Sequence, residues 1–150
     1  TLSLHDALPI SVGAMITKKS LMNKFQKNPI LGHITTFGGH PVIAAAGFKS
    51  LSIILKERLS EKTLDKERLF RSLLKHPYIE EIRGKGLMIA LILKNEKLAN
   101  QLVLKSLDNG LILFWLLYEK KAVRITPPLN ISKTEIKKGC KIILSILNSI

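Results

Sequence analysis

The fold of this chain is indicated first by residues 78–93, which read YIEEIRGKGLMIALIL. Two runs rich in isoleucine, leucine and methionine, at 78–83 and 87–93, lie on either side of the short sequence GKG. Apolar runs of this length, joined at glycines, are typical of a β-hairpin. We therefore expect two antiparallel strands, with the chain reversing at the two glycines.

Helical patterns lie on both sides of this hairpin. Pro41 suits the first turn of a helix, and apolar residues then recur at three- and four-residue steps over about 41–59. Further helices are predicted at about 64–75, before a His-Pro pair, and at 97–109, before Gly110.

The C-terminal part ends with the clearest helix. Ser132 and Glu135 form the S-x-x-E pattern of a capping box, and the apolar residues after them line one face. Two more strands are predicted before this helix, at 111–117 and 122–126. The order helix, helix, strand, strand, helix, strand, strand, helix predicts an α+β fold, in which helices cover one side of a small, largely antiparallel sheet.

The first forty residues are less regular. A short buried strand is predicted at 12–16 and a short helix at 19–27, whereas 28–41 contains the asparagine, glycine and proline residues typical of a loop. Residues 1–10 carry neither the basic lead nor the long apolar run of a secretory signal, and the chain has no initiator methionine. We interpret the chain as a fragment of a cytoplasmic protein.

Composition excludes several classes of protein. With 46% hydrophobic residues the chain is able to build a core, and no run of ~18 apolar residues predicts a membrane span. The single cysteine, Cys140, excludes an internal disulfide, and its place on the apolar face of the last helix indicates a core thiol. The four histidines have no cysteine or acidic partners at ligand spacing, so no metal site is predicted.

The net charge of +13 raises the alternative of a basic nucleic-acid-binding domain. The lysines are scattered singly or in pairs, however, and no run of five or six basic residues occurs. The GKG sequence lacks the third glycine of a dinucleotide fingerprint, and no phosphate-binding loop of the Walker type is present. We therefore favour the reading in which the balancing acidic surfaces lie on a part of the protein outside this chain.

A candidate binding site remains at residues 33–41, HITTFGGHP. The hydroxyls of Thr35 and Thr36 precede a glycine pair and the start of a helix, an arrangement that suits an anion such as phosphate. The other reading is an ordinary loop whose hydroxyls cap the helix. The chemistry alone favours this ordinary loop.

The same segment resembles the loop that class III aminotransferases place at their dimer interface. Three further segments match that family in the right order. They are VGA at 12–14 with the helix after it, EIRGKGLM at 81–88, and VRITPPL at 123–129 with the S-x-x-E pattern that follows. Four motifs in order, from about residue 12 to the C-terminus, are far more specific than any one of them.

The resemblance implies the organisation of the chain. Residues 11–40 would be the end of the large cofactor-binding domain together with the interface loop, and 41–59 a connecting helix. Residues 60–150 would be the C-terminal small domain of a fold-type I enzyme. Residues 1–10 do not resemble the family, and we interpret them as an artefactual start.

The resemblance also implies the chemistry. Class III aminotransferases use pyridoxal 5'-phosphate to move an amino group from an amino acid or ω-amine to a 2-oxo acid, and they work as homodimers. Thr36, with Thr35 beside it, matches the threonine that binds the cofactor phosphate in the neighbouring subunit's site. Arg124 matches the arginine that binds the substrate α-carboxylate, for which a guanidinium offers two parallel donors. The alternative for Arg124 is a solvated strand arginine.

One part of the family pattern is absent. The lysine that forms a Schiff base with the cofactor precedes the glycine-rich strand in the family, and that register falls on Leu4, whereas the first lysine of this chain is Lys18. The aspartate that holds the pyridinium nitrogen lies further upstream still. Transamination needs both groups, so no catalytic residue is assigned and the isolated chain is predicted to be inactive.

Two alternatives to an aminotransferase fragment stay open. They are a non-catalytic dimerising or binding domain of the same fold, and the basic nucleic-acid-binding domain. Within the family, the sequence does not distinguish ornithine, acetylornithine, 4-aminobutyrate and other ω-amines as donors, nor does it exclude a glutamate-semialdehyde aminomutase.

Overall fold

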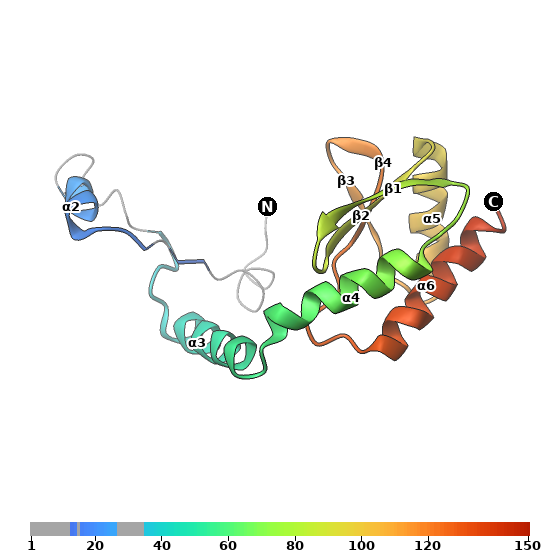
Figure 1. Cartoon of the computed structure of the whole chain (residues 1–150). Helices are drawn as coiled ribbons and strands as arrows, with labels where there is room; N and C mark the ends of the chain where they lie inside the picture. Colours follow the sequence, from blue (N-terminus) through green and yellow to red (C-terminus); the bar gives the residue numbers. More distant parts are fainter. Residues whose placement is uncertain (1–12, 15, 27–34) are drawn as a thin grey trace. The chain divides into compact units, whose positions relative to one another are not determined.

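The computed structural model describes residues 13–14, 16–26 and 35–150 (Figure 1). The chain divides into two compact units, Thr1–Lys56 and Glu57–Ile150. Among the described residues, the second unit holds all of the β-structure and every buried side chain.

The first unit contains only helices and turns in its described part. A four-residue helix, α2 (Lys19–Met22), continues into a 3-10 turn, η1 (Asn23–Gln26), where the sequence predicts one short helix. The strand predicted at 12–16 is not formed by Gly13, Ala14 and Ile16, which are exposed and outside any strand; Val12 and Met15 lie outside the described residues. A strand satisfies its backbone groups only beside another strand, and the described part of this unit offers none.

The long helix predicted at 41–59 ends earlier than the sequence pattern indicates. Helix α3 spans Pro41–Lys56 and α4 spans Leu59–Leu73, whereas the pattern places the start of the second helix at about residue 64. Between the two helices, Arg58 has a left-handed backbone with φ 52°, which a non-glycine residue rarely adopts. The apolar period continues through this break because Leu59 belongs to the buried face of α4.

The second unit contains one four-stranded sheet of order β1-β2-β4-β3, antiparallel throughout. Its strands are β1 (Ile79–Lys85), β2 (Met88–Leu93), β3 (Phe114–Leu116) and β4 (Glu119–Ile125). The predicted hairpin and the small antiparallel sheet are therefore confirmed. Strand β3 is shorter than the run predicted at 111–117, because only three of its residues pair with β4.

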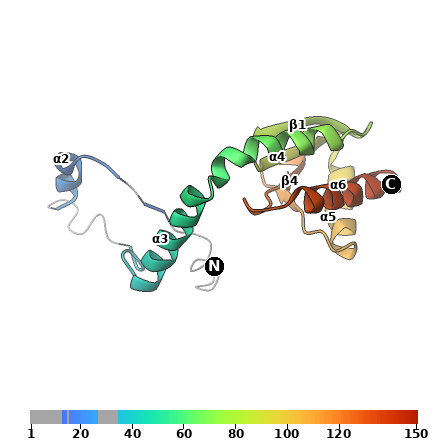
Figure 2. The same cartoon turned by 60° about the horizontal axis from the view of Figure 1, so that its bottom comes forward.

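Helices α4, α5 (Glu96–Asp108) and α6 (Lys133–Leu147) cover one face of this sheet (Figures 1 and 2). Alternate strand residues enter the core together with apolar residues of the three helices. The core members that are fully inaccessible to solvent include Leu91, Leu93, Leu102, Val123 and Ile136. This arrangement confirms the predicted α+β architecture.

The turn between β1 and β2 is held against α4 by two charged side chains. Glu67 accepts a hydrogen bond from the Gly86 N–H at 2.5 Å, and Arg71 donates to two carbonyls of β1 at 2.5 and 3.0 Å. The Gly86 N–H, followed by Arg71, lowers the pKa of Glu67. Gly84 has φ 111°, and a Cβ there would come 1.9 Å from the Met88 carbonyl oxygen, so only glycine fits.

Helix α6 begins as the sequence predicts. Ser132 Oγ accepts a hydrogen bond from the Glu135 N–H at 3.2 Å, and Glu135 Oε2 accepts one from the Ser132 N–H at 2.8 Å. These reciprocal bonds form the expected capping box. The Ser132 N–H is the main cause of the lowered pKa of Glu135.

Candidate functional site

Thr35 and Thr36 lie in a turn immediately before α3. A backbone hydrogen bond of 3.1 Å from the Gly38 N–H to the Thr35 carbonyl closes this turn. The Thr35 hydroxyl packs over Gly38, where an added Cβ would come 2.8 Å from Thr35 Oγ1. Both threonines are exposed, and neither the hydroxyl nor the N–H of Thr36 has a partner among the described residues.

Arg124 lies on the sheet face opposite the helices. In the ladder it pairs with Ala90 of β2 on one side and with Phe114 of β3 on the other. Residues directly opposite each other on neighbouring strands share a face, so these three side chains form one row. The next row contains Leu91 and Val123, which are buried under the helices, whereas Arg124 is exposed. The guanidinium carbon of Arg124 lies 5.0 Å from the centre of the Phe114 ring.

Arg124 differs from the other four arginines of the chain in its partners. Each of the others forms an ion pair with a nearby carboxylate: Arg58 with Glu61, Arg68 with Asp65, Arg71 with Glu67, and Arg83 with Glu81. Within the described residues no carboxylate or carbonyl accepts a hydrogen bond from Arg124, whose contact is with an aromatic ring. The five N–H donors of its guanidinium therefore remain available to a ligand.

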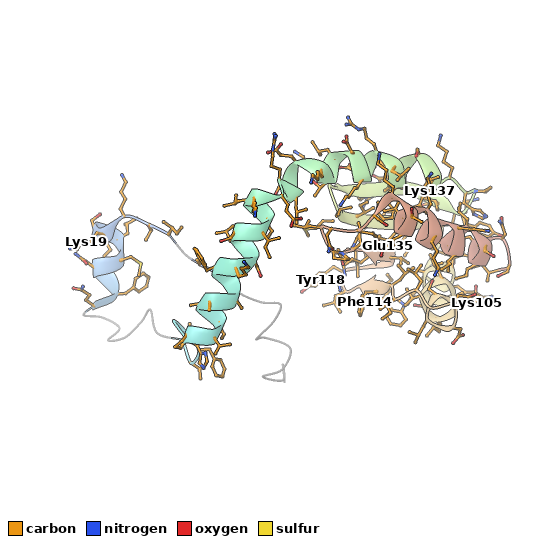
Figure 3. All side chains as sticks on the ribbon, turned by 90° about the horizontal axis from the view of Figure 1, so that it is seen from below. Lys19, Lys105, Phe114, Tyr118, Glu135 and Lys137 are labelled. Atoms are coloured by element: carbon orange, nitrogen blue, oxygen red, sulfur yellow. The ribbon has the colours of Figure 1, made fainter. Side chains whose placement is uncertain are left out.

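A cavity of about 330 Å³ opens beside Arg124 and Phe114. Most of its lining is apolar and comes from the segment before β3, the segment after β4 and α6: Leu111, Ile112, Pro127, Pro128, Ile131 and Gly139. Among the described residues, Arg124 is its only cation and Glu135 its only carboxylate; Figure 3 labels Phe114 on β3 and Glu135 on α6. Glu135 accepts a hydrogen bond from the Ser132 N–H, whereas the side chain of Arg124 has no polar partner among the described residues. A single free cation in an apolar cavity suits an organic anion.

The described residues provide little support for a cysteine nucleophile, a metal site or a membrane-spanning helix. Cys140 is buried on α6, as predicted, and burial raises the pKa of its thiol to about 11, which makes it a poor nucleophile near neutral pH. In the described ranges, no three histidine, cysteine or acidic side chains gather where they could hold a metal ion. No helix in the same part of the chain is long and apolar enough to cross a membrane.

The sequence and the fold match one family of known proteins. The family model of the class III aminotransferases matches residues 6–147. The chain belongs to the class III aminotransferases. The match begins at residue 6, so it includes part of the segment 1–10, which contains no recognisable motif of the family.

Individual aminotransferases agree with this assignment. The acetylornithine aminotransferase of Caldanaerobacter subterraneus subsp. tengcongensis is 35% identical over 123 residues, which cover 79% of this chain and 30% of the relative. An aminotransferase from Bacillus anthracis superposes with a TM-score of 0.76 at 26% identity, over 89% of this chain and 34% of that one.

A third relative is described with its cofactor. The structure of the ornithine aminotransferase from Toxoplasma gondii reveals partial occupancy of PLP at its active site; it superposes with a TM-score of 0.67 at 27% identity, over 77% of this chain and 29% of that one. This class III aminotransferase chain therefore spans about a third of the length of the proteins it matches.

The structure groups the predicted site residues in two places. Thr35 and Thr36 share one turn of the first unit, whereas Arg124 belongs to the second. Sequence reasoning missed Phe114, although an aromatic residue and an arginine on neighbouring predicted strands were a signal. Their contact depends on the register of β3 with β4, which shifts between Trp115 and Leu116 and has no local sequence marker.

Proposed function

We propose that this chain is the C-terminal part of a pyridoxal 5'-phosphate-dependent aminotransferase, in which Arg124 binds the α-carboxylate of the amino acid and of the 2-oxo acid. The proposal depends on one observation: Arg124 is exposed, has no acidic partner among the described residues and is one of the residues that line a largely apolar cavity. Guanidinium offers two parallel N–H donors to a carboxylate, which gives both affinity and orientation.

The turn before α3 supplies groups that fit the phosphate of this cofactor. A phosphate ester needs hydrogen-bond donors, and Thr36 offers an exposed hydroxyl and an N–H without an acceptor in the described residues. We assign Thr36, with Thr35 beside it, to the phosphate of the cofactor in the neighbouring protomer of a homodimer. The pyridoxal group, when bound, supplies the electron sink for transamination.

The proposed organisation follows the family. Residues 11–40 end the large cofactor domain, 41–59 connect the domains and 60–150 form the small domain of a cytoplasmic enzyme. No lysine precedes Lys18, so this chain lacks the group that holds the cofactor covalently, and we propose that it is inactive alone. Turnover of an amino donor and 2-oxoglutarate by the isolated chain with added cofactor would contradict this proposal.

A titration of the full chain with 2-oxoglutarate tests the role of Arg124. The chain has five arginines, so the Nε–Hε region of its nuclear magnetic resonance spectrum contains five signals, which single substitutions assign. We expect a saturable shift of the Arg124 signal, and binding weakened about tenfold or more in Arg124→Lys, because an ammonium cannot reproduce a two-point contact.

Arg83→Lys is the matched control for this titration. Arg83 lies opposite Ala90 in the same row of the sheet, but its guanidinium is paired with Glu81 at 2.7 Å. Its replacement should leave the affinity for 2-oxoglutarate unchanged. Equal affinity of Arg124→Lys and the unaltered chain would overturn the assignment of Arg124.

A further inference from the structure

A second residue bears on the proposed carboxylate site. Phe114 is 49% exposed, although it is a large apolar residue on an open sheet face. Its ring centre lies 5.0 Å from the guanidinium carbon of Arg124, within the ~6 Å range of a cation–π contact. Both residues are among those that line the cavity beside β3 and β4.

We propose that Phe114 is a positioning residue, which holds the guanidinium of Arg124 in the orientation that binds a carboxylate. The inference rests on the proposed role of Arg124. A long, exposed side chain has many rotamers, and a binding site functions better when one of them is already favoured.

An aromatic ring orients an arginine in a way that an acidic residue cannot. The other four arginines are each held by a carboxylate, which occupies their N–H donors and offsets their charge. A ring attracts the cation through its π-electrons and adds no negative charge. Phe114 therefore restrains Arg124 while its charge and donors stay free for a carboxylate ligand.

The neighbouring residue of β3 agrees with this placement of Phe114. Trp115, the next residue, donates its indole N–H to Asn100 Oδ1 of α5 at 2.8 Å. Successive side chains of a strand point to opposite faces, so with Trp115 on the side of the helices Phe114 lies on the side of Arg124. The cross-strand pair of Phe114 and Arg124 in the ladder has the same consequence.

The lining of the cavity indicates the ligand class. Leu111, Ile112, Pro127 and Pro128 line the cavity together with Arg124, and the one carboxylate among its described lining residues, Glu135, is bonded to Ser132. A carboxylate on a small organic body fits this lining, because its charged end meets Arg124 and the remainder contacts apolar side chains.

The test repeats the 2-oxoglutarate titration on the full chain with Phe114→Ile, Phe114→Tyr and Trp115→Leu. Isoleucine removes the ring but keeps a strong preference for strand. We expect Phe114→Ile to weaken binding about two- to fivefold, the size of an exposed cation–π contact, and Phe114→Tyr to restore it. Trp115→Leu is the matched control, since Trp115 is an aromatic residue of the same strand with similar exposure, 46%, on the other face, and it should bind normally.

The spectrum of the unaltered chain gives a second, independent readout. Protons above an aromatic face are shifted upfield, so the side-chain protons of Arg124 should be displaced from those of the other four arginines. The displacement should persist in Phe114→Tyr and disappear in Phe114→Ile.

The outcomes separate this inference from the proposed function. Normal affinity in Phe114→Ile, with Arg124→Lys still impaired, overturns the role of Phe114 alone, as does an equal loss in Trp115→Leu. Normal affinity in Arg124→Lys overturns the proposed function itself. If backbone amide shifts reveal that Phe114→Ile disturbs the fold, the spectrum of the unaltered chain is the deciding measurement. Arg124 side-chain protons without an upfield displacement would then overturn the contact between Phe114 and Arg124.

Discussion

Glu67 contacts two elements at once, because it accepts the Gly86 N–H of the β1–β2 turn and pairs with Arg71 of its own helix. Its side chain is only 14% exposed, whereas both partners of pairs such as Arg58–Glu61 are mostly in water. Exposed pairs contribute little to stability, since solvent screens them and both side chains lose freedom. The anionic form of Glu67 thus matters more than that of the other paired acids on α4.

Replacing Glu67 by glutamine should lower the free energy of unfolding by about 1–3 kcal/mol near neutral pH, the range for hydrogen bonds to a charged group. Urea denaturation measures this quantity. Glu61→Gln on the same helix is the control and should change stability by less than about 0.5 kcal/mol.

The effect of Glu67→Gln should depend on pH in one direction. The pKa of Glu67 in the folded chain lies below its ordinary value of 4.5, so on acidification the unfolded chain takes up the proton first. The stability that the carboxylate contributes is present above that value and is lost as pH falls through the folded pKa. The difference in free energy of unfolding between the unaltered chain and Glu67→Gln should therefore become smaller as the pH is lowered. A difference that stays constant or grows would contradict the assigned contacts.

At the scale of elements, α6 has a start that its own sequence defines. The capping box of Ser132 and Glu135 satisfies two N–H groups that lack partners inside the helix. The first turn of α6 also borders the cavity through Glu135 and Ile136. Fraying of this turn would loosen one wall of the proposed carboxylate site.

Ser132→Ala should destabilise the chain by about 0.5–2 kcal/mol, because the Glu135 N–H loses its acceptor. Circular dichroism during urea denaturation measures the change. Thr134→Ala, an exposed position in the same turn whose side chain makes no hydrogen bond among the described residues, should be neutral or slightly stabilising. An equal loss in both variants would show that the cap contributes nothing specific.

Where the sequence carries a capping residue or a terminating glycine, the ends of the helix were predicted to within a few residues. Helix α5 begins after Asn95, whose side chain accepts the Leu98 N–H, and ends before Gly110. The boundary at Arg58 was predicted wrongly, because a left-handed arginine leaves no mark in the apolar period. The candidate site shows the same difference. Arg124 was proposed from a local motif, whereas its contact with Phe114 depends on the pairing of β3 with β4.

At the scale of the whole molecule, the chain combines a high charge with uncovered apolar surface. No residue of α3 is buried, and Val42, Phe48, Leu51 and Leu55 are each more than half exposed. Apolar surface of this extent favours association. The net charge of +13 opposes it through repulsion between copies, which salt screens.

We therefore expect the chain to self-associate, more strongly as salt is raised, in size-exclusion chromatography with light scattering. The double variant Phe48→Ser and Leu55→Ser should shift the distribution toward the monomer. Leu104→Ser with Leu107→Ser removes two similarly exposed leucines from α5 and serves as the control, which should associate like the unaltered chain. A monomer at all salt concentrations would refute the expectation.

The left-handed residue Arg58 has a practical consequence. All the buried hydrophobic residues that the structure describes lie between Leu59 and Leu147, so no described residue before the break belongs to this buried set. A shortened version starting at Arg58 would keep these buried residues, the residues that line the cavity and the strand that carries Phe114. It would also lack α3 with its exposed apolar residues, so the proposed carboxylate binding could be measured with less self-association.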